Sequence, residues 1–121
     1  MRKHIYQLIV LDEYGGINVK ITNKFPDWGY LRNLVGSLIE MVSVNLDYRF
    51  LIIVEEDCVI SKKKNNRLAS KLCGRQVFGP AVLLKADGEK IAAFTADECP
   101  HIINYLMFLP YMDGIIKVVI E

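Results

Sequence analysis

The sequence predicts an α+β fold: a single small domain over residues 1–121, with a mixed, mostly antiparallel sheet of about five to seven strands and three helices. Three observations support this prediction. Short β-rich segments are separated by glycine turns, one central segment is apolar on both faces, and three segments combine helix-capping residues with apolar residues at helical spacing. No repeat or low-complexity linker marks a domain boundary.

The first hairpin is expected from residues 4–11 and 17–22. Between them, Tyr14-Gly15-Gly16 is typical of a tight turn, because glycine accepts positive φ angles without strain. The second segment alternates apolar and polar residues, so one of its faces should be exposed to water.

Two helices are expected in the first two thirds of the chain. Asp27 can cap a short helix that ends at Gly36. Asn65 or Asn66 can cap a second helix, for which Gly74 is a typical stop signal. The inward faces should be formed by Tyr30, Leu31, Leu34 and Val35 in the first helix and by Leu68, Ala69, Leu72 and Cys73 in the second.

The central hairpin is expected over residues 38–54, with its turn at residues 45–47 and Val42 opposite Phe50. Because side chains two apart share a face, this register places apolar groups on both sides of residues 48–54. A strand that is apolar on both faces is usually covered on both, so this segment is predicted to be a central strand.

Glu40 is the exception on the apolar face of this hairpin, where it should lie opposite Ile52. Burial of an unpaired carboxylate is costly, so two interpretations stay open. Glu40 is either solvated near the sheet edge, or it pairs with a cation and lines a pocket. The candidate cations are Arg49, Arg67 and Arg75.

Three further strands and a third helix are expected in the C-terminal part. The strands are predicted at residues 76–85, 90–94 and 115–120. Gly79-Pro80 should lie at a bulge, a strand start or an edge, because proline donates no ladder hydrogen bond. The helix should begin at Thr95-Ala96-Asp97-Glu98, which has the spacing of a capping box.

Composition disfavours some classes of function. The 121 residues are 52% hydrophobic, which suffices for a substantial core, and the mean hydropathy of +0.22 suggests surplus apolar surface that a homo-oligomer would bury. Apolar runs such as Leu51–Val54 are too short to cross a bilayer, so no membrane association is expected. A net charge of +1, from 15 basic and 14 acidic residues, gives no overall attraction to nucleic acid.

The three cysteines, Cys58, Cys73 and Cys99, have no short repeated spacing, which indicates reduced thiols in a cytoplasm. Cys99-Pro100-His101 brings a thiol and an imidazole close in sequence, but a zinc site would need about four ligands from distant positions. A buried apolar thiol is the favoured interpretation. No metal and no cofactor is predicted.

The candidate ligand site is the basic concentration over residues 62–75. Lys64, Asn66 and Arg67 lie at the predicted start of the second helix, where free backbone N–H groups favour anions, and Arg75 follows its end. Phosphate binding is therefore expected here. The alternative is a solvated loop in which Asn66 serves only as the helix cap. Glycine-rich phosphate-loop spacing is absent, which disfavours a nucleoside triphosphatase.

Glu55-Glu56-Asp57 is the densest acidic cluster. Consecutive strand residues point apart, so a divalent metal would lack convergent oxygen ligands, and a solvated turn is favoured. Glu40 and Glu55 stay candidates for ligand contact. In an alternative function, either carboxylate would be the general base of a hydrolase, which requires a tuned pKa and reach to the substrate.

A set of short motifs covers about the middle two fifths of the chain: Val35-Gly36, Ile39-Glu40, Val54-Glu55-Glu56-Asp57, Asn66-Arg67 with Ala69, and Gly79 with Val82. This pattern resembles a family of small proteins of unknown function found in phages, plasmids and other mobile elements. The family typically has a second glycine after Val-Gly and a glycine after the acidic turn, where this chain has Ser37 and Cys58. The resemblance implies an accessory protein in the cytoplasm of a bacterial host.

We therefore expect a small non-enzymatic phage or mobile-element protein that acts by binding, of a counter-defence or host-takeover type. Its target would be a host or defence protein, or a phosphate-bearing small molecule. Two alternatives remain: a hydrolase of a phosphate ester or cyclic nucleotide, and a purely structural oligomerisation module.

Overall fold

The computed structural model describes residues 5–36, 38–45, 49–56, 63–87, 90–107 and 116–120. Along these ranges, short helices separate successive pairs of strands. The elements are β1 (Tyr6–Leu11), β2 (Ile17–Thr22), α1 (Trp28–Val35), β3 (Ile39–Asn45), β4 (Arg49–Glu55), α2 (Arg67–Cys73), β5 (Ala81–Asp87), β6 (Lys90–Ala92), α3 (Glu98–Met107) and β7 (Ile116–Ile120).

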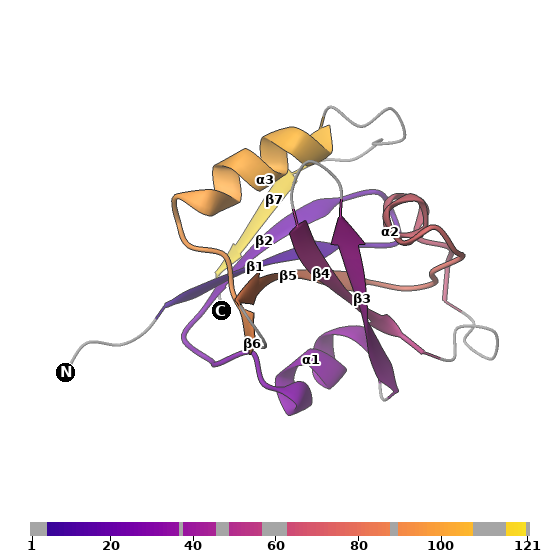
Figure 1. Cartoon of the computed structure of the whole chain (residues 1–121), viewed down its shortest axis with the longest axis horizontal. Coiled ribbons are helices and arrows are strands. Elements are labelled where there is room, and N and C mark those ends of the chain that lie inside the picture. The colour runs from indigo at the N-terminus through magenta and orange to yellow at the C-terminus, as the bar shows by residue number, and fades with distance from the viewer. Residues whose placement is uncertain are drawn as a thin grey trace.

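The strands form one seven-stranded sheet in the order β3-β4-β5-β1-β2-β7, with β6 paired to β5 (Figure 1). The described strand pairs are antiparallel, apart from the parallel pair β2–β7. Gly15, at φ 87°, lies in the turn between β1 and β2, as its sequence predicts. The predicted α+β fold, with a mixed and mostly antiparallel sheet and three helices, is confirmed.

Helices cover both faces of this sheet, with α1 on one face and α2 and α3 on the other (Figure 1). In β4, Ile53 is buried in the core beneath α1, whereas Phe50, Ile52 and Val54 are buried in the core beneath α2 and α3. The prediction that this strand is covered on both faces is therefore confirmed. None of the helices in the described ranges is long and apolar enough to cross a membrane.

The register of the β3–β4 hairpin differs from the prediction by two residues. Val42 pairs with Ile52 and not with Phe50. The reason is the position of the connection, which spans residues 46–48, outside the described residues, instead of 45–47. Moving a turn by one residue shifts the pairing by two, and a shift of two leaves every side chain on its predicted face.

The helix caps follow the prediction for α1 and α2. Asp27 Oδ1 accepts a hydrogen bond from Tyr30 N at 2.9 Å, and α1 ends at Gly36. Asn66 caps α2, and Gly74, in the left-handed conformation at φ 70°, ends it.

β5 begins at Ala81 and not at residue 76 as predicted. Gly79 has a φ of 82°, which no regular strand residue adopts, and Pro80 cannot donate to a ladder. The chain before them forms only a single bridge, between Phe78 and Asn65. Gly79-Pro80 is thus a strand start, one of the three placements that the sequence allowed.

Candidate functional site

Asn66 is a buried structural residue at the start of α2, with 1% of its surface exposed. Its side-chain amide donates to Leu11 O and to Gly79 O, both at 2.9 Å, and its Oδ1 accepts from Ala69 N at 3.1 Å. These bonds join β1, α2 and the entry to β5. Asn66 therefore serves as the cap of α2, which is the alternative to phosphate binding that the sequence left open. Its side chain is not accessible to a ligand at the surface.

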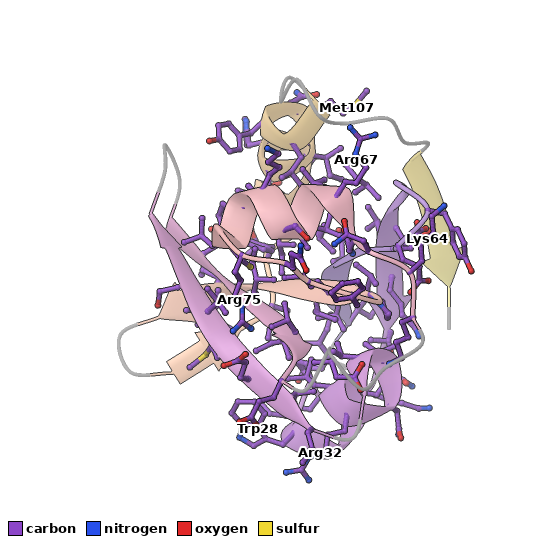
Figure 2. The ribbon with its side chains drawn as sticks, turned by 90° about the vertical axis from the view of Figure 1, so that its right-hand side faces the viewer. Trp28, Arg32, Lys64, Arg67, Arg75 and Met107 are labelled. Atoms are coloured by element: carbon purple, nitrogen blue, oxygen red, sulfur yellow. The ribbon has the colours of Figure 1, made fainter. Side chains whose placement is uncertain are left out.

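Lys64 and Arg67 are exposed but have different surroundings (Figure 2). Lys64 Nζ lies 5.3 Å from the centroid of the Tyr14 ring, beside the β1–β2 turn, and Arg67 is the first residue of α2. Neither side chain lines the two grooves described below. The structure does not bring Lys64, Asn66 and Arg67 together around either groove, contrary to the predicted arrangement.

Glu55, at the end of β4, connects three segments. Its Oε2 lies 2.9 Å from Lys63 Nζ, and the same ammonium donates to Val35 O, at the end of α1, at 2.7 Å. Gly36 packs against this carboxylate, since a Cβ there would come within 2.9 Å of Glu55 Cδ. Val35, Gly36 and Glu55, which belong to two of the short motifs of the sequence, thus meet here, and their contacts with Lys63 hold the end of α1 to the sheet.

Glu40, on edge strand β3, is paired. Its Oε1 accepts a hydrogen bond from Arg75 Nη2, and both side chains are partly exposed. Glu40 lies opposite Val54 in the ladder, on the face toward α2, and not opposite Ile52 as predicted. Of the interpretations left open for Glu40, the structure shows the paired one, with Arg75 as the cation.

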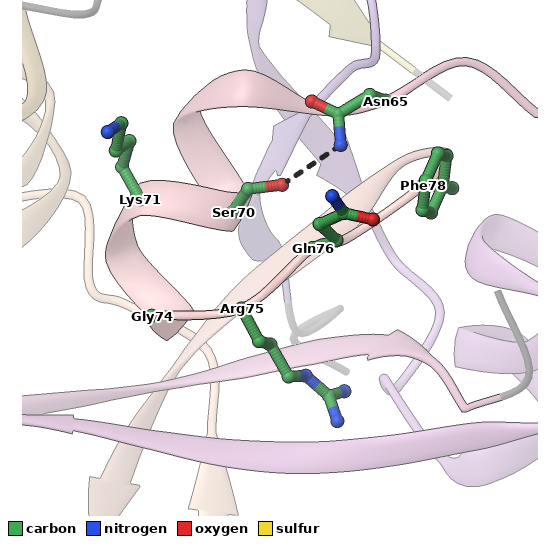
Figure 3. Close-up of a pocket in the computed structure, with 7 residues that line it drawn as sticks. All are labelled: Asn65, Ser70, Lys71, Gly74, Arg75, Gln76 and Phe78. Atoms are coloured by element: carbon green, nitrogen blue, oxygen red, sulfur yellow. Dashed lines mark hydrogen bonds between the residues drawn. The ribbon is translucent and has the colours of Figure 1, made fainter. Parts of the chain in front are cut away.

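A groove of about 690 Å³ lies beside this ion pair, at the C-terminal end of α2 (Figure 3). Phe78 and the amide side chains of Asn65 and Gln76 gather at one end of it, Lys71 lies at the other end, and Arg75 points toward the strands. We call it the α2 groove; its lining residues are Asn65, Ser70, Lys71, Gly74, Arg75, Gln76 and Phe78.

Gly74 shapes the α2 groove, because its left-handed conformation ends the helix and turns the chain back along it. The returning chain is fixed to α2: Val77 N donates to Ser70 Oγ at 2.8 Å, and Phe78 bridges to Asn65. Asn65 Nδ2 and Ser70 Oγ lie 3.5 Å apart across the groove wall. Arg75 was among the predicted site residues, whereas Ser70 and Gln76 were not, although Gly74 was a signal that the chain reverses there.

The charge of the α2 groove is positive on balance. Lys71 is exposed and forms no ion pair with another described residue, whereas Arg75 is neutralised in part by Glu40. Arg75 retains donor capacity, because a guanidinium carries five N–H groups and the bond to Glu40 comes from Nη2. The groove can thus offer several donors to an anion.

A second groove, of about 310 Å³, lies on the opposite side of β3, beside α1. We call it the β3 groove; its lining residues are Trp28, Arg32, Leu38, Ile39 and Glu56. Trp28 and Leu38 are exposed, by 45% and 57%. Figure 2 shows Trp28 and Arg32 beside α1, on the other side of the strands from Arg75. Trp28 therefore does not fill the core.

Burial disfavours ionisation of the two described thiols. Burial raises the pKa of Cys73 to about 11, an effect that Arg75 opposes and Glu40 reinforces. Burial also raises the pKa of Cys99 to about 11, with Glu98 adding to the effect. Both are protonated at neutral pH and are therefore poor nucleophiles and metal ligands. In the part of the chain that the structure describes, no three His, Cys, Asp or Glu residues group to hold a metal ion.

The chain matches no protein-family model, no curated protein and no solved structure. The likeness to mobile-element proteins therefore stays a prediction that rests on the short motifs.

Proposed function

We propose that this chain is a non-enzymatic binding protein that holds a phosphate-bearing small molecule in the α2 groove. The observation that carries the proposal is the combination of Lys71 and Arg75 with a wall of amide and hydroxyl groups around about 690 Å³. Small-molecule sites of this kind commonly have volumes of about 300–1,000 Å³ and place a few polar groups to orient the ligand.

The charged groups favour a phosphate over a neutral ligand. Hydrogen bonds from Lys or Arg to phosphate oxygens are about twice as strong as bonds between neutral groups. Lys71 contributes a point charge, and Arg75 contributes planar donors that its partner Glu40 helps to hold in place. Two cations against one carboxylate leave a net positive charge for a phosphate to neutralise.

The opposite end of the α2 groove suits a planar ring. Phe78 is partly exposed there and offers a face for stacking, which contributes about 1–3 kcal/mol per base in proteins that bind single-stranded nucleic acid. The amides of Asn65 and Gln76 lie beside it and provide donors and acceptors for a base edge. A nucleotide, with phosphate toward Lys71 and base toward Phe78, matches this polarity.

Sequestration of a signalling nucleotide would accord with the predicted role of a phage or mobile-element accessory protein in counter-defence. That role depends on the resemblance of the motifs, whereas the ligand class depends on the groove.

The proposal is tested by isothermal titration calorimetry with adenosine monophosphate, cyclic adenosine monophosphate and inorganic phosphate, using adenosine as the uncharged control. We expect the double variant Lys71→Gln/Arg75→Gln to weaken nucleotide binding about tenfold or more, because it removes two charge-assisted contacts. The matched control, Lys64→Gln/Arg67→Gln, removes the same charge at the opposite end of α2. It should bind nearly as the parent chain does.

Equal losses in both double variants would show that only long-range charge matters and would reject the α2 groove as the site. Nucleotide binding no stronger than adenosine binding would reject the phosphate. Incubation of the parent chain with the same nucleotides, followed by chromatography, addresses the hydrolase alternative. Conversion to product would contradict a purely binding role.

A further inference from the structure

We propose that two copies of this chain join through β3, whose free edges pair antiparallel across a twofold axis and continue the sheet from one copy into the other. β3 lies at the end of the described strand order, with β4 as its one neighbour there. The proposal rests on the edge itself and does not depend on the ligand of the α2 groove.

The backbone of β3 is ready to accept another strand. Leu38 O accepts from Glu56 N at 2.7 Å, so residue 38 directs its backbone groups toward β4. In an antiparallel ladder, residues alternate between those bonded to the neighbour and those facing away. Ile39, Met41 and Ser43 therefore direct their N–H and C=O groups to the open side.

The side chains along this edge do not block pairing. Soluble proteins usually protect edge strands with an unpaired charge, a proline or a bulge. Ile39, Met41 and Ser43, whose backbone groups face outward in β3, carry no charge. Glu40 of the same strand does carry a charge, but it is paired with Arg75 of the same chain. Met41 is 47% exposed, which is high for an apolar residue in a sheet.

The apolar surface extends beyond the strand. Trp28, in α1, is exposed by 45% on the side of the sheet toward which Met41 projects, and Leu38, which lines the β3 groove with Trp28, is exposed by 57%. Exposed apolar side chains that gather at one edge are a feature of interaction surfaces.

The charges at this edge favour a second copy as the occupant. Arg32 and Glu56 line the β3 groove together, are both exposed and pair with no other described residue. Arg75 and Glu40 balance each other on the other side. The described charges at this edge therefore balance, so they do not repel a second copy, whereas they offer a strongly charged partner no net attraction.

A twofold axis can join the two β3 strands so that their outward-facing backbone groups meet. A twofold axis normal to the sheet runs the two strands antiparallel and keeps the α1 side of both copies on the same face. With the axis at Met41, this residue meets its own copy, and Ile39 faces Ser43 of the second chain. The Met41 and Trp28 side chains of both copies then lie on the same face of the joined sheet.

Sedimentation equilibrium over the micromolar to millimolar range tests the dimer. We expect the parent chain to dimerise, and Met41→Pro to raise the dimer dissociation constant at least about tenfold, because proline removes an outward N–H. Met41→Glu provides a second variant that keeps the backbone donor but places like charges at the axis. Met107→Glu, at a 51% exposed methionine of α3, is the charge-matched control and should dimerise as the parent chain does.

Each outcome decides the proposal. A parent chain that stays monomeric over the whole range overturns it, and a strand from another protein would then be the occupant of the edge. Dimers of unchanged affinity in a folded Met41→Glu chain would also overturn it. Failure of nucleotide binding would contradict the proposed function of the α2 groove but leave this result unaffected.

Discussion

Asn66 shows how one side chain can fix the arrangement of distant segments. Its amide reaches Leu11 O, 55 residues earlier in the chain, and Gly79 O, 13 residues later, while its Oδ1 caps α2. A buried carbonyl that loses its donor retains the full cost of desolvation, so these bonds matter more than their number suggests. The residue that the sequence marked as a ligand contact is instead part of the scaffold beneath the α2 groove.

We expect Asn66→Ala to lower the free energy of unfolding by about 2–4 kcal/mol, because it removes a helix cap and leaves two buried carbonyls unsatisfied. Urea denaturation followed by circular dichroism measures this loss. Asn65→Ala is the natural control, since Asn65 is half-buried and its side chain makes one long hydrogen bond, of 3.5 Å, among the described residues. It should cost less than about 1 kcal/mol. Similar losses in both variants would contradict the structural role given to Asn66.

At the scale of the element, each of the three helices begins at a side-chain cap. α1 is capped by Asp27, α2 by Asn66, and α3 by the predicted capping box. In that box, Glu98 N donates to Thr95 Oγ1 at 3.2 Å and Thr95 N donates to Glu98 Oε1 at 2.9 Å. Glu98 also pairs with Lys85 of β5 at 3.0 Å, which ties the start of α3 to the sheet.

The capping box predicts a pH dependence. The hydrogen bond from the Thr95 backbone lowers the pKa of Glu98 below its usual value of 4.5, and Lys85 contributes in the same direction. A lowered folded-state pKa stabilises the fold above the unfolded pKa, and this stabilisation is lost as the pH falls through the folded-state value. We expect Glu98→Gln to cost about 0.3–1 kcal/mol at neutral pH and almost nothing in strong acid.

Urea denaturation of the parent chain and the Glu98→Gln variant at both pH values checks this expectation. Glu13→Gln, in the β1–β2 turn, serves as the control for removal of a carboxylate elsewhere. A difference between parent and Glu98→Gln that does not shrink in acid would show that the carboxylate charge at α3 is not the cause.

At the scale of the whole molecule, both grooves flank the same edge strand. The α2 groove lies on one side of β3, next to Glu40 and Arg75, and the β3 groove lies on the other side, next to Trp28. Figure 2 shows Arg75 and Trp28 on opposite sides of the strands. The central strands β4, β5 and β1 are buried on both faces and form a rigid support for the two grooves. The edge strand β3 and its neighbours supply the exposed groups that a ligand or a second chain can contact.

Hydrogen exchange at this edge distinguishes a free strand from a paired one. We expect the Met41 and Ser43 amides to exchange rapidly at low concentration and to become protected as the concentration rises, because they face outward and would bond to the second copy. The Val42 amide faces β4 and should be protected at all concentrations. Exchange of Met41 that is independent of concentration would argue against pairing through β3.

Sequence periodicity determined which face each strand and helix buries, because that depends on residues two, three or four positions apart. The hairpin register illustrates its limit: a turn displaced by one residue moved Val42 from Phe50 to Ile52 without changing either face. The capping residues Asp27, Asn66 and Thr95 were likewise readable, since each acts on N–H groups within three residues.

Only the tertiary structure decided the candidate sites. Glu40 meets Arg75, 35 residues away, because β3 and the end of α2 are neighbours in space, and three arginines were equally available to it in the sequence. Phe78 reaches the α2 groove because Gly74 reverses the chain. Such contacts depend on how separate elements pack, and local patterning carries no information about that. The same reason explains why Asn66 turned out to be buried support and Arg75 the cation at the groove.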